Sequence, residues 1–214
     1  MSSRSPDEAR EVLDRLEAEH PDARIWLDFE SPFQLLIATI LAAQCTDERV
    51  NEVTKDLFEA YPTPADLAKA AREKVQEMVR STGFYRRKTE SIQKVSRALA
   101  EEHGGQVPDG RDALTDMSGV GRKTANVVLG NAFGQQALAV DTHVKRVSRR
   151  IGMASEKKAD KIEKELMELL PEDRWTRASQ LLTTHGRRIC TSRSPDCEAC
   201  PVSDMCDYYS REVA

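Results

Sequence analysis

The sequence predicts an all-α protein. Apolar residues recur at helical spacing along most of the 214 residues, and no run shows the strict alternation that is typical of a half-buried strand. Proline, serine, threonine and glycine stand at the ends of these segments, where helix caps and stops occur. With 39% hydrophobic and 32% charged residues, the chain can build a packed core, which excludes disordered and collagen-like classes.

The first predicted helix covers residues 7–19. Val12 and Leu16 share one face of it, and Pro6 precedes it at a favourable first helical position. A more apolar helix begins at Ser31-Pro32 and is expected to run to about Gln44, buried on most sides.

The remaining helices follow from the same spacing. Shorter helices are expected after Pro62-Thr63-Pro64, and His103-Gly104-Gly105 is a glycine stop at the end of a longer one. The longer helices are expected over residues 48–60, 85–102, 122–133, 141–151, 156–169 and 173–185.

We expect neither a membrane span nor an export signal in this protein. Its longest apolar run, residues 35–43, is far shorter than the ~20 residues that a spanning helix needs. The first eight residues include no apolar signal-peptide core. We therefore expect a cytoplasmic protein, with nothing that demands more than a monomer.

Basic residues are concentrated in three segments although the net charge is −4. Residues 84–97 carry five basic side chains and one acidic, residues 141–150 carry four and one, and residues 186–195 carry three and none. A local basic face is what attracts a polyanion, because salt screens exposed charges beyond about 8–10 Å. Charge alone leaves open whether these segments are ordinary solvated faces.

Four of the five cysteines lie near the C-terminus with the spacing C-x6-C-x2-C-x5-C. In a chain without an export signal this pattern indicates metal ligation rather than disulfides. Four thiolates suit either tetrahedral zinc or a [4Fe–4S] cluster, and the spacing does not decide between them. The four candidate ligands are Cys190, Cys197, Cys200 and Cys206.

A glycine-framed turn, Gly119-Val120-Gly121, directly precedes a predicted helix. Free backbone N–H groups and the helix dipole make such a turn a candidate anion site, although ordinary helix–helix turns look similar. Lys123 stands in the first turn of this helix and is a candidate amine nucleophile for Schiff-base chemistry. Asp141 follows 18 residues later as a candidate helix N-cap and functional carboxylate.

Five stretches in this order resemble the endonuclease III family of helix-hairpin-helix DNA glycosylases. The resemblance covers roughly residues 6–208. Its motifs are Leu-Leu-Ile-Ala-Thr-Ile-Leu-Ala-Ala-Gln-Cys-Thr-Asp (35–47), Gly-Val-Gly-Arg-Lys-Thr-Ala-Asn-Val-Val (119–128), Ala-Val-Asp-Thr-His-Val (139–144), Leu-Leu-Thr-Thr-His-Gly (181–186) and the four-cysteine tail.

The resemblance implies two helical domains with a DNA-binding cleft between them. A six-helix barrel-like domain with the helix-hairpin-helix motif would hold residues 25–135, and residues 1–24 and 136–214 would form a domain with a [4Fe–4S] cluster on the four cysteines. The implied activity is that of a bifunctional DNA glycosylase and abasic-site lyase of base excision repair. Its substrates would be oxidised pyrimidines and abasic sites in double-stranded DNA, in a prokaryote-like nucleoid.

The resemblance also assigns roles to single residues. Lys123 would attack C1′ of the damaged nucleotide and displace its base, after which β-elimination nicks the strand 3′ to the lesion; Asp141 would assist the first step. The residues expected to contact DNA are Gln44, Asp47, Phe84, Gly119, Val120, Gly121, Thr124 and His143. Gln44 and Phe84 would fill the gap that an extruded nucleotide leaves.

The chain departs from the family pattern at two places. Met117-Ser118 stands where leucine-proline is usual, and Phe84 replaces a more usual leucine. A bulkier residue at position 84 leaves the substrate preference open but not the reaction. Two alternatives also stay open: a relative specialised for a mismatch or photodimer lesion, and a non-enzymatic iron–sulfur protein that binds DNA or senses redox state. Lys123 and Asp141 favour an enzyme, because binding alone requires neither.

Overall fold

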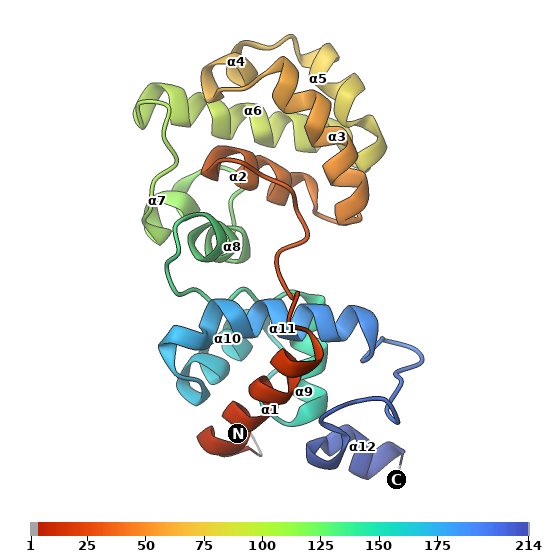
Figure 1. The fold of residues 1–214 in the computed structure, drawn as a ribbon. Helices are drawn as coiled ribbons and strands as arrows, with labels where there is room; N and C mark the ends of the chain where they lie inside the picture. Colours follow the sequence, from red (N-terminus) through yellow and green to blue (C-terminus); the bar gives the residue numbers. More distant parts are fainter. Residues whose placement is uncertain (1–3, 214) are drawn as a thin grey trace. The chain divides into compact units, whose positions relative to one another are not determined.

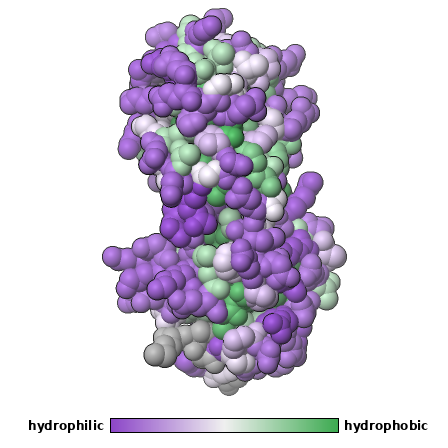
Figure 2. Space-filling view, turned by 90° about the vertical axis from the view of Figure 1, so that its left-hand side faces the viewer, coloured by the Kyte–Doolittle hydropathy of each residue, from purple (hydrophilic) through white to green (hydrophobic). Residues whose placement is uncertain are grey.

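A computed structural model describes residues 4–213, and these fold into α-helices and short 3-10 helices with no strand among them. The all-α prediction is confirmed. The chain divides into two compact units, Trp26–Gly134 and the combination of Met1–Ile25 with Gln135–Ala214 (Figure 1). Hydrophilic side chains cover most of the face of each unit that Figure 2 shows. No helix of the described residues is long and apolar enough to cross a membrane.

The unit Trp26–Gly134 is built around one apolar helix, α2, in which eight of ten residues are buried. The side chain of Ser31 begins this helix by accepting the Gln34 N–H, and α2 lies between α6 and α8 (Figure 1). The helices of this unit are α2 (Pro32–Leu41), α3 (Asp47–Ala60), α4 (Pro64–Lys69), α5 (Arg72–Val79), the 3-10 helix η1 (Arg80–Thr82), α6 (Tyr85–Glu102), α7 (Arg111–Asp116) and α8 (Arg122–Ala132).

The expected continuation of α2 to Gln44 is wrong. The helix ends at Leu41, and Gln44 has a φ of 54°, in the left-handed region that ends helical hydrogen bonding. Thr46 then begins α3 as its N-cap, with its side chain accepting the Arg49 N–H. The predicted stop of α6 is confirmed, since Gly104 and Gly105 have positive φ and the Gly105 N–H reaches back 2.8 Å to the Leu99 carbonyl.

The second unit packs helices from both ends of the sequence around one core. Leu13 and Leu16 of α1 belong to the same buried cluster as Val144 and Val147 of α9 and Leu181 of α11. The helices of this unit are α1 (Pro6–Glu19), α9 (Thr142–Ile151), α10 (Ala159–Leu169), the 3-10 helix η2 (Glu172–Arg174), α11 (Trp175–Arg188), the 3-10 helix η3 (Ser203–Met205) and α12 (Asp207–Glu212).

The helix boundaries in this unit differ most from the prediction at α10 and α11. α10 begins at Ala159 rather than 156, because the carboxylate of Glu165 accepts the N–H groups of Ser155 and Glu156 and holds them outside the helix. α11 begins at Trp175 rather than 173 and continues three residues beyond 185, to Arg188. The six-residue helices α7 and α12 were not predicted, because a periodic signal needs a window of about 11 residues or more.

Candidate functional site

The glycine-framed turn before α8 needs glycine at only one of its two positions. Gly119 has a φ of 94°, and a Cβ there would lie 3.2 Å from the Ser91 side chain. Gly121 has a φ of −90° and is the N-cap of α8, without a side-chain cap for the first N–H groups. Val120 is buried and anchors the turn in the core. The uncapped helix start therefore offers backbone donors to an anion.

Lys123 lies in the first turn of α8 with an exposed side chain. The neighbouring Thr124 is half-buried. An amine on the first turn is repelled by the positive end of the helix dipole and attracted to any anion bound by the preceding turn. Lys123 is thus available to a ligand that binds at Gly119–Gly121.

A pocket of about 270 Å³ brings four of the predicted DNA-contacting residues together within the unit Trp26–Gly134. The four residues are Gln44, Phe84, Gly119 and Thr124. The pocket is also lined by Thr39, Ile40, Ala43, Arg87, Lys88 and Ser91. Three further residues of this unit, Asp47, Val120 and Gly121, were expected to contact DNA and are not among those that line it.

Two residues at the rim of this pocket have left-handed backbones. Gln44 has a φ of 54° and Phe84 a φ of 47°, a conformation that costs a residue with a side chain about 1–2 kcal/mol. The Phe84 side chain is 61% exposed, which is unusual for a large aromatic residue. Such strain persists only where the surrounding structure enforces it, and it is often found at functional sites.

Asp141 belongs to the other unit and is the N-cap of α9. One carboxylate oxygen accepts the N–H groups of His143 and Val144 at 2.8 and 2.7 Å, and the other lies 3.1 Å from Nδ1 of His143. Gly186 of α11 packs against α9, and a Cβ there would lie 3.0 Å from the His143 Cβ. Asp141 is therefore oriented by three donors and by close helix packing.

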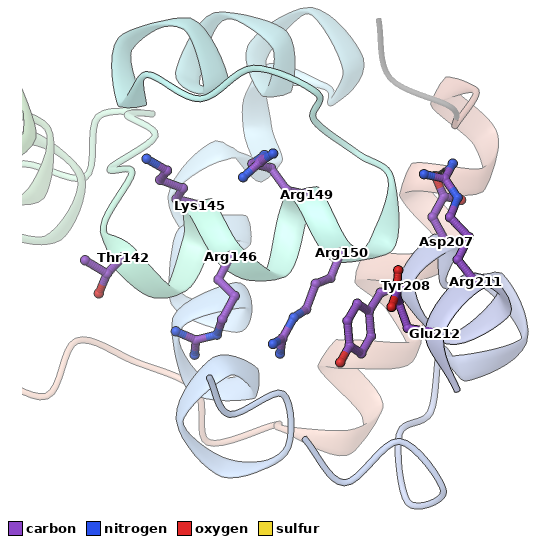
Figure 3. Close-up of a pocket in the computed structure, with 9 residues that line it drawn as sticks. All are labelled: Thr142, Lys145, Arg146, Arg149, Arg150, Asp207, Tyr208, Arg211 and Glu212. Atoms are coloured by element: carbon purple, nitrogen blue, oxygen red, sulfur yellow. Dashed lines mark ion pairs between the residues drawn. The ribbon is translucent and has the colours of Figure 1, made fainter. Parts of the chain in front are cut away.

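A basic groove with a volume of about 560 Å³ lies along α9 and α12. Figure 3 shows Lys145 and Arg149 extending from one side of α9, while Arg146 and Arg150 extend from the other. The groove, defined by its lining residues, consists of Thr142, Lys145, Arg146, Arg149, Arg150, Asp207, Tyr208, Arg211 and Glu212. Five cationic side chains against two carboxylates make it attractive to an anion.

The four C-terminal cysteines line one narrow cavity, and none of the described cysteines forms a disulfide. Burial, with a smaller contribution from the neighbouring cysteines, raises the pKa of the Cys200 thiol to about 11. Burial likewise raises the pKa of Cys197 and Cys206. Four thiolates this close together repel one another and become stable only with a cation among them, so these residues fit a metal-containing group.

The arrangement of these thiols differs from that of a single-ion site. Among residues 4–213, no group of three or more His, Cys, Asp or Glu side chains is arranged to hold one metal ion. Donors surround the thiols instead: Arg150 lies 3.4 Å from the Cys190 sulfur, and Nε2 of His185 lies 3.5 Å from the Cys200 sulfur. His185 in turn meets the buried His20 at 3.1 Å. Such outer contacts orient metal ligands.

Sequence analysis missed individual residues of the pocket and groove. Lys88 is 5% exposed, and its ammonium lies 2.6 Å from the Thr82 carbonyl oxygen. Burial lowers the pKa of Lys88 below its usual value. Nothing in the sequence distinguishes it from the exposed basic residues of α6, because its burial depends on the packing of other helices. Tyr208 and Arg211 were missed because α12 is too short to be predicted.

Comparison with family models gives two matches. Residues 37–172 match the HhH-GPD superfamily base excision DNA repair protein model. Residues 190–206, which contain the four cysteines, match the iron-sulfur binding domain of endonuclease III.

The chain is also similar to individual proteins and structures. It is 46% identical to the endonuclease III of Synechocystis sp. (92% of this chain, 91% of that protein) and 42% identical to that of Escherichia coli K12 (92% and 94%). A trapped covalent intermediate of endonuclease III with DNA superposes with a TM-score of 0.94 at 42% identity, covering 99% of this chain and 100% of that one. A thermostable thymine-DNA glycosylase superposes at 0.81 with 28% identity, covering 93% of each chain.

Proposed function

The chain belongs to the endonuclease III family of base excision repair enzymes, DNA glycosylases that are also abasic-site lyases, and from this we propose that it removes oxidised pyrimidines from double-stranded DNA and cleaves 3′ to the abasic site. The observation that carries the proposal is the placement of Lys123. Its exposed amine follows directly on the uncapped, glycine-framed start of α8. Similarity to a covalent enzyme–DNA intermediate supports covalent catalysis on this fold.

The proposed reaction uses Lys123 twice. Its unprotonated Nζ attacks C1′ of the damaged nucleotide, and the bond between C1′ and the base breaks, with the electron pair leaving on the base. Ring opening then gives a Schiff base between Nζ and C1′. Loss of a proton from C2′ expels the 3′ phosphate by β-elimination, and water releases the lysine. The backbone donors at Gly119–Gly121 bind a phosphate of the same strand.

Asp141 assists the first step in this proposal. Two backbone N–H groups hold one of its oxygens, and this fixes the carboxylate in one orientation. A fixed negative charge stabilises the positive charge that develops on the sugar as the base leaves. The same cap therefore serves both helix stability and chemistry.

In this proposal, Gln44 and Phe84 fill the gap that the extruded nucleotide leaves in the base stack. Extrusion costs a few kcal/mol of stacking and pairing, and an apolar side chain inserted into the stack recovers part of it. The exposed ring of Phe84 and the side chain of Gln44 line the same pocket, which is the arrangement this role requires.

The protein has an iron–sulfur binding segment, and we assign a [4Fe–4S] cluster to Cys190, Cys197, Cys200 and Cys206. The cluster would supply the positive charge that the four clustered thiolates need and would tie residues 190–206 to α9. We assign the unit Trp26–Gly134, with its seven α-helices, to the helix-hairpin-helix domain and the other unit to the cluster domain. The basic groove on α9 would contact phosphates outside the lesion, and the enzyme would act in the cytoplasm as a monomer.

Borohydride trapping tests the proposal, because reduction converts a Schiff base into a stable bond. The protein should become covalently attached to abasic duplex DNA, and Lys123→Gln should abolish this while leaving DNA binding intact. Lys94→Gln, at an exposed lysine paired with Glu90, is the matched control and should trap normally. Trapping by Lys123→Gln would assign the nucleophile elsewhere. A panel of single-lesion duplexes in the same assay identifies the preferred base.

A further inference from the structure

The loop that carries Phe84 is held in a strained conformation. Gly83 and Phe84 have φ angles of 72° and 47°, and Phe84 begins α6 without a side-chain cap. The Phe84 carbonyl accepts the N–H groups of Arg87 and Lys88, so the residue is tied to the first turn of the helix that follows. A phenylalanine with a left-handed backbone conformation and an exposed ring persists only where neighbouring contacts enforce that conformation.

Lys88 supplies a contact on the other side of this loop. Its side chain runs back along the first turn of α6, and its ammonium donates to the Thr82 carbonyl at 2.6 Å. Thr82 is itself buried, and its hydroxyl donates to the Val79 carbonyl at 2.8 Å. Gly83 and Phe84 are therefore bracketed by two residues that are anchored in the interior.

The burial of Lys88 separates it from the other basic residues of α6. Although it lines the pocket, it is only 5% exposed, whereas Arg86 and Arg87 are exposed. Removing an ammonium from water is unfavourable, and burial lowers the pKa of this lysine accordingly. The buried ammonium of Lys88 is instead bound to the carbonyl oxygen of Thr82, at the start of the loop that carries Phe84.

We propose that Lys88 is a positioning residue for base extrusion: its bond to the Thr82 carbonyl holds Gly83 and Phe84 in the conformation that presents the Phe84 ring to the DNA stack. The inference rests on the role assigned to Phe84 under the proposed function. Without this bond, Phe84 relaxes to an ordinary backbone conformation and its ring leaves the rim of the pocket. DNA is still bound, but the damaged nucleotide is extruded less often.

Single-turnover kinetics on two substrates test this role. Lys88→Met keeps most of the length of the side chain and removes the ammonium. Excision from a lesion-containing duplex should slow about tenfold, which is equivalent to about 1.4 kcal/mol. Cleavage of a preformed abasic site in single-stranded DNA requires no extrusion, and its rate should stay within about twofold. A general loss of structure would lower both rates.

Two further measurements link the effect to Phe84. The fluorescence of 2-aminopurine placed opposite the lesion rises when the stack opens, and Lys88→Met should reduce this rise. Phe84→Ala should slow duplex excision as well, and the double variant should be no slower than Phe84→Ala alone, because residues that act through one another are not additive. Lys94→Met on the exposed face of α6 is the matched control and should behave as the unmodified protein.

The outcomes separate this inference from the proposed function. If Phe84→Ala excises the lesion from duplex DNA as fast as the unmodified protein, the role assigned to Phe84 is wrong, and so is the role of Lys88 that depends on it. If Phe84→Ala is slow while Lys88→Met is fast, or if the two effects add, the role of Lys88 alone is overturned. Should Lys88→Met fail to fold, Lys88→Leu takes its place, because it also removes the ammonium that donates to the Thr82 carbonyl and should show the same substrate-selective loss.

Discussion

Asp141 and His143 form a closed pair at the start of α9: one Asp141 oxygen accepts the His143 N–H at 2.8 Å while the other lies 3.1 Å from Nδ1 of the same residue. The carboxylate is therefore held in a single orientation by the backbone of the helix that it caps. Its charge is separable from its capping role, since an amide oxygen can accept the same backbone hydrogens.

Asp141→Asn should still cap α9 but should no longer promote base excision. We expect the excision rate on a lesion-containing duplex to fall by about 100-fold or more, because the charge that stabilises the developing sugar cation is gone. The melting temperature should change little. His143→Ala, which keeps the carboxylate, should cost much less activity. An Asp141→Asn enzyme with full excision activity would remove Asp141 from the mechanism.

Gly119→Ala should impair both folding and DNA binding. The new Cβ would sit 3.2 Å from the Ser91 side chain at a φ of 94°, and the left-handed strain alone is about 1–2 kcal/mol. Urea unfolding and DNA titration measure the two effects. Gly110→Ala is the control, because φ there is −107° and no atom lies within 4 Å of its Cβ. Equal behaviour of the two variants would contradict the anion-site geometry.

Lys145→Ala combined with Arg149→Ala should weaken DNA binding in a salt-dependent manner. Both side chains line the basic groove, and the slope of log affinity against log salt becomes shallower by about one unit for each phosphate that the protein no longer neutralises. The weakening should be the same for damaged and undamaged duplexes. Lys157→Ala, at an exposed lysine of the same unit outside the groove, should leave the slope unchanged. An unchanged slope in the double variant would exclude the groove from the interface.

Cys197→Ser should remove the cluster. We expect the purified protein to lose its broad visible absorption and to melt at a lower temperature, because ligand binding stabilises the region around residues 190–206. Iron and sulfide analysis of the unmodified protein should give about four of each per chain. Cys45→Ser, at the free cysteine of the other unit, should keep both colour and stability. A colourless, zinc-loaded and natively folded protein would contradict the assignment.

The burial of Lys88 predicts a pH dependence of stability. Its pKa is lowered in the native state, so the unfolded chain binds more protons at this position as the pH approaches the usual value of 10.5. The contribution of Lys88 to the free energy of unfolding therefore rises with pH through this window. Lys88→Met should lack this rise in urea unfolding between about pH 8 and pH 10, whereas Lys94→Met should retain it. Parallel curves for Lys88→Met and the unmodified protein would show that Lys88 is not buried.

The sequence by itself determined the features that depend only on residues close to one another along the chain. Helix spacing, the proline and serine starts, the glycine stop after α6 and the cysteine spacing are local signals, and the all-α class and the family followed from them. The end of α2 at Leu41 could not be predicted from the sequence, because the left-handed turn at Gln44 depends on where the next helix begins.

Tertiary structure alone decided which side chains meet and which are buried. His20 and His185, separated by 165 residues, touch only because α1 packs against α11. Lys88 became an interior residue and Phe84 an exposed one, the reverse of what their chemistry suggests. Burial is a property of the packed helices together, and strain such as that at Phe84 is sustained by contacts from residues that a local pattern does not include.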